Sequence, residues 1–138
     1  HHIDSLKKLM LKVEELSEAL KNRDLRMALC HTDVHGWNLM FTGQHLKLID
    51  WEGLKLAPVE ADMMSFVDEP YFSEFMRIYA NTHSQYEVNI EALTFYQGRR
   101  KLEDVWEFME QLLFDTQADA DRKATLNHLK KELEGITP

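Results

Sequence analysis

Residue types that can do chemistry are concentrated in one short stretch, CHTDVHGWNLMF, at positions 30–41. His31, Asp33, His35 and Asn38 lie there within eight residues, among apolar neighbours. Asp50 follows at the end of the next apolar run, in the segment LKLIDWE. Polar groups at this density are costly to bury unless they bind something. This polar stretch is therefore the candidate functional site.

Two patterns within the polar stretch predict different chemistry. In an extended strand, His31, Asp33 and His35 would project from one face and could bind a transition metal, as in a metal-dependent hydrolase. In the longer pattern His-x-Asp-x-x-x-x-Asn, Asp33 would instead accept the proton of an attacking hydroxyl during phosphoryl transfer. Asn38 and Asp50 would then supply the oxygen ligands that Mg²⁺ prefers. The second pattern explains more of the polar residues with one arrangement.

The surrounding sequence predicts a predominantly helical α+β fold with one small β-hairpin. The runs NLMF and LKLID flank residues 42–45, where Gly43 favours a tight turn, so the hairpin would begin near Asn38 and end at Asp50. Apolar residues at spacings of three and four predict an N-terminal helix up to Leu20. After Pro58, helices are predicted near 59–66, 70–81, 88–115 and 117–134, with an interruption of the third at Gly98.

Composition is that of a soluble globular protein. The 138 residues, 44% of them hydrophobic and 29% charged, fit a single domain spanning 1–138. No apolar run approaches the roughly 20 residues that cross a bilayer, and no signal-peptide pattern is present, so we expect no membrane contact and a cytoplasmic location. The single cysteine, Cys30, permits no internal disulfide and is expected to be a buried core residue.

The net charge of −8 is unevenly distributed. Residues 50–92 carry nine acidic side chains against only Lys55 and Arg77. Nucleic-acid binding rests on neutralising phosphates, so this distribution disfavours a nucleic-acid partner. It favours a cationic small molecule instead.

Three segments, HTDVHGWN, LKLIDWE and LAPVEADMM, together resemble the C-terminal lobe of the aminoglycoside phosphotransferase family, within the protein-kinase-like superfamily. The spectinomycin phosphotransferase branch is especially similar, because its aspartate-tryptophan-acid segment also leads into Ala-Pro-x-Glu-x-Asp. The resemblance is strong over residues 28–66 and loose over the helices that follow. It implies ATP- and Mg²⁺-dependent phosphorylation of a hydroxyl on a small, often cationic molecule.

The resemblance also assigns roles to individual positions. Asp33 corresponds to the catalytic aspartate, and Asn38 and Asp50 correspond to the Mg²⁺ ligands. Structural support of the loop is expected from His31, His35 and Asp62. Substrate contacts are expected from Glu52, Glu60, Asp68 and Glu69, whereas Trp37 and Trp51 are expected to pack within the protein.

A kinase-like enzyme also needs an N-terminal lobe that supplies a phosphate-covering loop, a lysine and a glutamate. The five glycines, at positions 36, 43, 53, 98 and 135, have no phosphate-loop spacing, and 30 residues precede His31. We therefore expect a C-terminal lobe whose nucleotide-binding lobe is absent from this chain, and which turns over ATP poorly alone. A kinase-like lobe that serves as an inactive binding module remains the other interpretation.

Overall fold

The computed structural model describes residues 2–136. The chain divides into two compact units. One, called the site unit here, is Asn22–Gln97, and the other, called the helical unit, comprises residues 2–21 and 98–136. Helix α4 (Ile90–Phe114) contributes its first part to the site unit and its second part to the helical unit.

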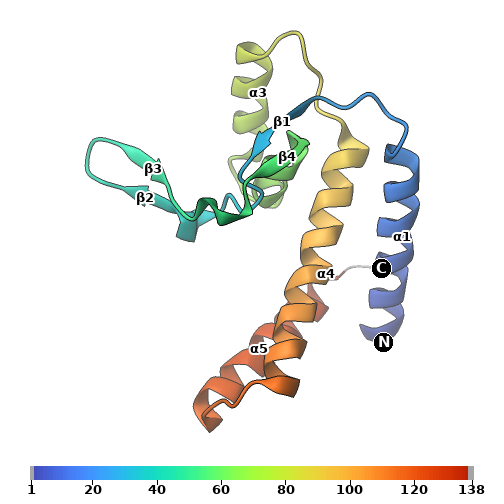
Figure 1. Cartoon of the computed structure of the whole chain (residues 1–138), viewed down its shortest axis with the longest axis vertical. Helices are drawn as coiled ribbons and strands as arrows, with labels where there is room; N and C mark the ends of the chain where they lie inside the picture. Colours follow the sequence, from blue (N-terminus) through green and yellow to red (C-terminus); the bar gives the residue numbers. More distant parts are fainter. Residues whose placement is uncertain (1, 137–138) are drawn as a thin grey trace. The chain divides into compact units, whose positions relative to one another are not determined.

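The site unit contains two small antiparallel sheets (Figure 1). Strand β1 (Met27–Cys30) pairs with β4 (Lys55–Pro58), and β2 (Leu39–Phe41) pairs with β3 (Leu46–Leu48). The β2–β3 hairpin lies where the sequence predicts it, and Gly43 adopts the positive φ of +82° that its turn requires. Strand β4 is not predicted by the sequence, because its four residues end in a proline and resemble a connecting segment.

Three helical segments continue the site unit after β4, as predicted. They are α2 (Glu60–Met63), the 3₁₀ helix η3 (Met64–Phe66) and α3 (Phe72–Thr82). Met63, Met64 and Leu93 form their buried core. A second buried cluster, Cys30, Ala57 and Ala61, joins the β1–β4 pair to α2. The end of β1, where the polar stretch begins, is therefore fixed against α2.

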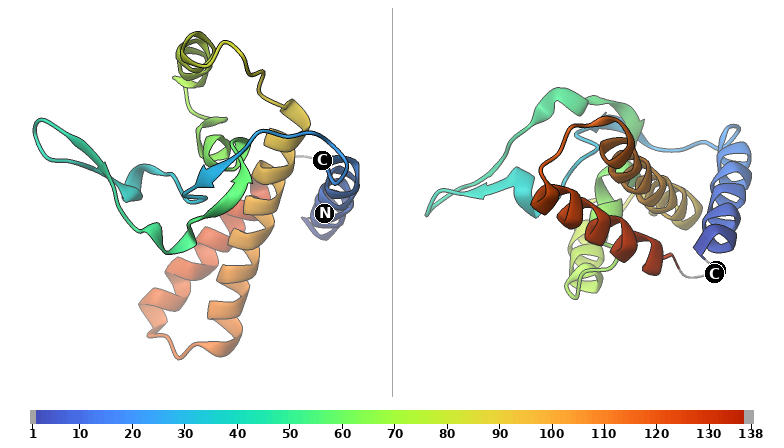
Figure 2. Two further views of the ribbon diagram at one scale, coloured as in Figure 1. Left: turned by 45° about the horizontal axis from the view of Figure 1, so that its top comes forward. Right: turned by 90° about the horizontal axis from the view of Figure 1, so that it is seen from below.

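The helical unit consists of α1 (His2–Leu20), the second part of α4, and α5 (Asp119–Glu134), which runs antiparallel to α4 (Figure 2). These helices confirm the predicted helical segments. Helix α4 passes through Gly98 without a break, so the predicted interruption is wrong. No helix within residues 2–136 combines the length and the apolar content needed to span a bilayer.

Gly98 is needed for the close approach of α1 to α4 rather than for a break. A Cβ atom at this position would lie 2.8 Å from Val13 Cγ2 and 3.3 Å from Leu9 Cδ1. Val13 is β-branched and has little rotamer freedom in a helix, so it cannot turn away easily.

We therefore expect Gly98→Ala to lower the free energy of unfolding by about 1–2 kcal/mol, although alanine is the better helix former. Urea unfolding monitored by circular dichroism would measure the change. In a Val13→Ala background, which removes the clashing methyl, the same substitution should be neutral or stabilising. A loss of equal size in both backgrounds would contradict this account of the contact.

Candidate active site

His31 is the buried centre of the polar stretch. Its side chain is 1% exposed and lies edge-on to the Trp51 ring, with the ring centroids 4.9 Å apart. The ring nitrogen Nε2 donates to the carbonyl oxygen of Ile49 at 2.8 Å, and Nδ1 accepts the backbone N–H of Asp33 at 3.3 Å. Nε2 thus joins this loop to the exit of the hairpin, and Nδ1 fixes the backbone within the loop.

The carboxylate of Asp62 holds the backbone of the same loop. Its Oδ2 accepts the N–H of His31 at 3.0 Å, and its Oδ1 accepts the N–H of Thr32 at 2.6 Å. Thr32 has a φ of +69°, a left-handed conformation that β-branched residues rarely adopt. The Thr32 hydroxyl donates to the carbonyl oxygen of Gly53 at 3.1 Å, where an added Cβ would crowd that hydroxyl. Two charge-assisted bonds therefore hold the loop in a strained conformation.

Removing this carboxylate should loosen the loop and destabilise the fold. We expect Asp62→Ala to lower the free energy of unfolding by about 2–4 kcal/mol, because two backbone N–H groups lose a charged acceptor. Chemical denaturation would measure it, and amide exchange at Thr32 should accelerate more than exchange in α5. Glu69→Ala, which removes an exposed carboxylate from the same unit, is the control and should change stability by less than about 0.5 kcal/mol. Similar losses in the two variants would contradict this role.

Asp33, His35 and Asn38 are joined through their side chains. Oδ2 of Asp33 lies 3.1 Å from Nδ2 of Asn38 and 3.2 Å from Nε2 of His35. Nδ1 of His35 accepts the N–H of Trp37 at 3.2 Å and so caps the 3₁₀ helix η1 (Gly36–Asn38). Nε2 is therefore the nitrogen that carries the proton toward Asp33. Nδ2 of Asn38 also donates to the Asp33 carbonyl at 3.0 Å, which leaves the amide oxygen out of these bonds.

The hairpin brings Ile49, the residue before Asp50, into contact with Asn38 of this cluster. The N–H of Ile49 donates to the carbonyl oxygen of Asn38 at 2.9 Å, so the two ends of the hairpin are in direct contact. Asp50 follows with a φ of +64° and precedes the 3₁₀ helix η2 (Trp51–Gly53), to which its side chain makes no capping bond. The donor set of Asn38 Oδ1 and the exposed Asp50 carboxylate consists of hard oxygen atoms. Such atoms fit Mg²⁺ in kind.

The acidic residues expected to contact substrate lie in different environments. Glu60 is 3% exposed, its Oε1 accepts the N–H of Asn89 at 2.7 Å, and its Oε2 is buried without a hydrogen-bond partner. The proposed substrate contact of Glu60 stays a prediction, and in this structure its carboxylate is buried against the start of α4. Glu52, Asp68 and Glu69 are exposed.

The two tryptophans near the site also differ. Trp51 packs against His31 while remaining half exposed, and its Nε1 donates to the carbonyl oxygen of Leu48 at 2.8 Å. Trp37, between Asp33 and Asn38, is 92% exposed. The expectation that Trp37 packs within this chain is therefore wrong.

Cys30 is buried as predicted, and its environment disfavours the thiolate. Burial raises the pKa of the thiol from 9.0 to about 11, with a further contribution from the negative charge of Asp62. Its Sγ donates to the carbonyl oxygens of Ala57 and Pro58 at 3.4 and 3.5 Å.

We expect the free energy of unfolding to fall as the pH rises from about 9 to about 11, because the unfolded chain releases the Cys30 proton in that range while the folded chain retains it. Urea titrations at several pH values would measure this trend. Cys30→Ala is the control, since it should flatten the trend. An equal pH dependence in both proteins would contradict the assignment to Cys30.

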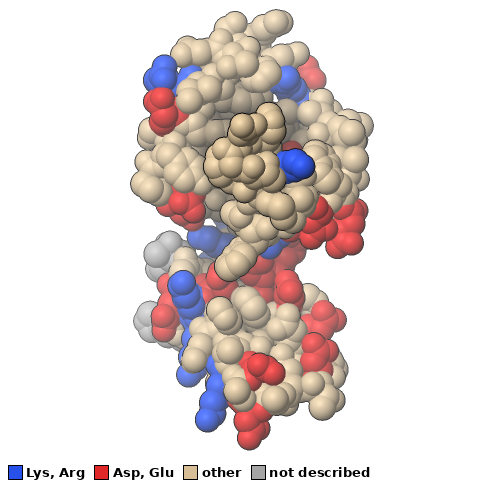
Figure 3. All heavy atoms as spheres, turned by 90° about the vertical axis from the view of Figure 1, so that its left-hand side faces the viewer, with Lys and Arg blue, Asp and Glu red and all other residues tan. Residues whose placement is uncertain are grey.

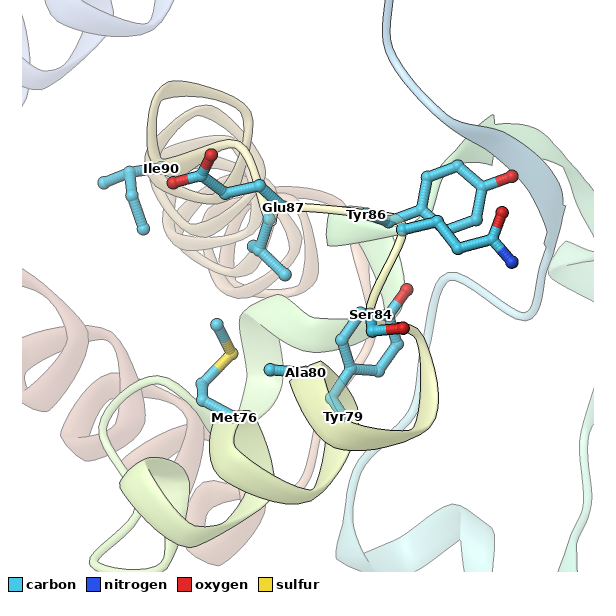
Figure 4. Close-up of a pocket in the computed structure, with 9 residues that line it drawn as sticks. Met76, Tyr79, Ala80, Ser84, Tyr86, Glu87 and Ile90 are labelled. Atoms are coloured by element: carbon cyan, nitrogen blue, oxygen red, sulfur yellow. The ribbon is translucent and has the colours of Figure 1, made fainter.

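Two cavities open in the site unit. One, of about 530 Å³, lies between α3, the segment 83–89 and the start of α4, and Tyr79, Tyr86 and Glu87 border it (Figure 4). No residue of the polar stretch lines it. The other, of about 380 Å³, is lined by Cys30 and Val34 from the polar stretch and by Asp62. The second cavity is therefore bordered by the loop that carries Asp33.

The transition-metal hydrolase interpretation is wrong for this chain. Residues 31–35 do not form a strand, and both ring nitrogens of His31 are engaged within the protein. Within residues 2–136, no three His, Cys, Asp or Glu side chains are grouped so that they could hold a metal ion.

Comparison with known proteins decides the family. A family model described as the phosphotransferase enzyme family matches residues 2–104. The chain belongs to this family. No curated protein matches its sequence. Two solved structures have a similar fold, both of spectinomycin phosphotransferase APH(9)-Ia: a complex with ADP and spectinomycin (TM-score 0.75, 22% identity) and an AMP-bound complex (TM-score 0.73, 21% identity). Each comparison covers 96% of this chain and 44% of the other.

Membership of the phosphotransferase family confirms the family resemblance seen in the sequence. The two spectinomycin phosphotransferase structures, at 21–22% identity, show that the fold is similar. The helix-rich architecture with small sheets agrees with the predicted fold class and is consistent with a kinase-like lobe. This phosphotransferase chain spans less than half the length of the structures that it resembles.

Proposed function

We propose that this chain is the catalytic lobe of an ATP-dependent phosphotransferase that phosphorylates a hydroxyl group of a small molecule. The observation that carries the proposal is the Asp33–His35–Asn38 cluster, to which the hairpin is bonded through Ile49, the residue before Asp50. Phosphoryl transfer requires few groups from the protein, mainly a base that orients the acceptor and ligands that position the charged phosphates. This cluster supplies both kinds of group within one loop and one hairpin.

Asp33 is the residue that would orient the acceptor hydroxyl and take its proton. Its carboxylate is held by the amide of Asn38 and by the imidazole of His35, so it is positioned before substrate arrives. The His31 ring fixes the backbone of Asp33, because its Nδ1 accepts the N–H of Asp33. Such prior positioning is what makes a general base effective in a phosphotransferase site.

Asn38 and Asp50 would hold the metal ion. Asn38 uses its amide nitrogen to bind Asp33, which directs its oxygen to the opposite side for a ligand. Mg²⁺ bound there would neutralise charge on the phosphates of the nucleotide. The same asparagine would thus orient the base and hold the metal, which couples the two functions.

The acceptor is proposed to be a small aminated molecule with free hydroxyls, of the aminocyclitol or aminoglycoside type. Support comes from the net charge of −8 and from the spectinomycin bound in one of the structurally similar enzymes. Glu52, Asp68 and Glu69 are the exposed carboxylates that would meet the ammonium groups. A phosphotransferase acting on such a substrate would contribute to antibiotic resistance.

A second lobe is proposed to complete the nucleotide site. Large apolar side chains are exposed on η1, on the β2–β3 hairpin and after it, and the surface that carries this hairpin is mostly uncharged (Figure 3). An apolar surface of this kind is typical of a protein interface. The exposed residues are Trp37, Met40, Phe41, Leu46, Ile49, Trp51 and Leu54. The 138-residue chain alone is then expected to transfer phosphate poorly, and robust turnover by it would contradict the two-lobe proposal.

The experiment that tests the function uses a two-lobed protein containing this chain, incubated with ATP, Mg²⁺ and a panel of hydroxyl acceptors. The panel includes spectinomycin, an aminoglycoside, choline and an uncharged sugar, and mass spectrometry identifies the phosphorylated product. We expect one of the aminated antibiotics to be phosphorylated with the highest kcat/KM. Nucleotide binding without transfer to any acceptor would favour the inactive binding module instead.

A further inference from the structure

The cavity of about 380 Å³ that is lined by Cys30, Val34 and Asp62 differs in chemical character from the catalytic cluster. Its walls are largely apolar and come from β1, from Val34, from the α2–η3 segment and from α3. Phe66, Phe75 and Met63 are among these walls. The volume lies within the range of small-molecule sites. Asp33, Asn38 and Asp50 do not line it, so it is separate from the proposed transfer centre.

One cationic side chain in this cavity lacks a carboxylate partner. Arg26 is half-buried, its Nη1 donates to the Tyr79 hydroxyl at 2.8 Å, and its guanidinium carbon lies 3.9 Å from the centroid of the Tyr86 ring. Among the ion pairs of residues 2–136, none involves Arg26. A guanidinium has five N–H donors, and one is used here by a side-chain hydrogen bond. The remaining donors favour an anion, and chiefly a carboxylate.

The two ends of the cavity differ in charge. His83 also lines it, and its ring lies 4.7 Å from that of Tyr79, the residue bonded to Arg26. Tyr79 lines both cavities, whereas Tyr86 borders the neighbouring one, where both rings are visible in Figure 4. The lining carboxylate, Asp62, is at the loop end, where its two oxygens already bind backbone N–H groups. An anionic group would therefore bind at the Arg26 end, away from Asp62.

We propose that this cavity binds a small organic anion, a carboxylate with a flat apolar body. The carboxylate binds Arg26, and the apolar body packs against Phe75, Met63 and Val34. A cationic ligand is disfavoured for two reasons. The guanidinium of Arg26 would repel it, and the carboxylate that lines the cavity, Asp62, already accepts two backbone N–H groups. The site is thus distinct in ligand class from the surface carboxylates proposed for an aminated acceptor.

Binding of benzoate to the 138-residue chain tests the proposal, with benzamide as the uncharged analogue of the same shape and inorganic phosphate as an anion without an apolar body. Chemical-shift changes at the amides of Ala28, Val34 and His83 would report occupancy of the cavity. We expect saturable benzoate binding below about 20 mM, and binding of benzamide and of phosphate at least about tenfold weaker. Equal binding of benzoate and benzamide, or no saturable binding of benzoate, would overturn the proposal.

Two substitutions in the chain sharpen the test. Arg26→Gln should weaken benzoate binding by at least about tenfold, whereas Arg77→Gln should leave it unchanged, because Arg77 is paired with Glu74 on the surface at 2.8 Å. Unchanged benzoate affinity in a folded Arg26→Gln variant would refute the assignment. If that variant does not fold, Ala28→Leu is the deciding variant, because the larger side chain fills the cavity and leaves Arg26 in place. Loss of benzoate binding in Ala28→Leu would support the site, and retained benzoate binding would reject it.

Discussion

Asp33→Asn in a two-lobed protein containing this chain should lower kcat by about 10³-fold while leaving the KM for MgATP within about threefold. Asparagine keeps the size of the side chain and can still accept a hydrogen bond, but it cannot take the proton of the acceptor hydroxyl. Steady-state kinetics of acceptor phosphorylation would measure both parameters. The effect should therefore fall on the chemical step rather than on nucleotide binding.

Glu69→Gln is the matched control for Asp33→Asn, because it neutralises an exposed carboxylate outside the cluster. It should leave kcat within about threefold and, at most, raise the KM of a cationic acceptor. The melting temperatures of the variants should also agree, so that any loss is not one of folding. A fully active Asp33→Asn enzyme would remove Asp33 from the chemistry and with it the proposed mechanism.

Asp50→Ala is the second substitution with a large expected effect. We expect kcat to fall by at least about 10²-fold at saturating ATP and the Mg²⁺ concentration for half-maximal rate to rise, because a hard oxygen ligand is lost. Measuring the rate as a function of free Mg²⁺ separates this effect from a loss of acceptor binding. The free energy of unfolding should fall by only about 1 kcal/mol, because the exposed carboxylate makes no capping bond and the cost is that of placing alanine at a positive φ.

Glu52→Ala provides the comparison for Asp50→Ala, because Glu52 is also exposed and lies two residues along the chain. Its Mg²⁺ dependence should match that of the unsubstituted enzyme, even if its affinity for a cationic acceptor changes. Equal Mg²⁺ dependence of the Asp50→Ala enzyme and the unsubstituted enzyme would exclude Asp50 as a metal ligand.

The hairpin and the long helices could be predicted because each depends on short-range patterns. Gly43 between two apolar runs indicates the turn, and residues spaced by three and four indicate the helices. The pairing of β1 with β4 could not be predicted, because it joins short segments more than twenty residues apart and depends on packing against α2. The role of Gly98 could not be predicted for a related reason. Its role comes from contact with α1, which local helix propensity does not report.

The residue types of the site could be predicted from the sequence, but the contacts between them could not. The residue types in the polar stretch indicate phosphoryl transfer, yet the bonds from Asp62 to the His31 and Thr32 amides appear only when α2 is folded against β1. The burial of Glu60 is also a tertiary effect, since its Oε1 binds the backbone of a residue 29 positions away. Nothing in the local sequence distinguishes this carboxylate from its exposed neighbours.

The most direct test of the central claim is a crystal structure of a two-lobed protein containing this chain, bound to Mg²⁺ and ADP. We expect the amide oxygen of Asn38 and the carboxylate of Asp50 to lie about 2.0–2.1 Å from Mg²⁺. Nδ2 of Asn38 should still contact Asp33. A metal ion held without Asn38 and Asp50, or an Asn38 amide turned so that its nitrogen faces the metal, would contradict the account.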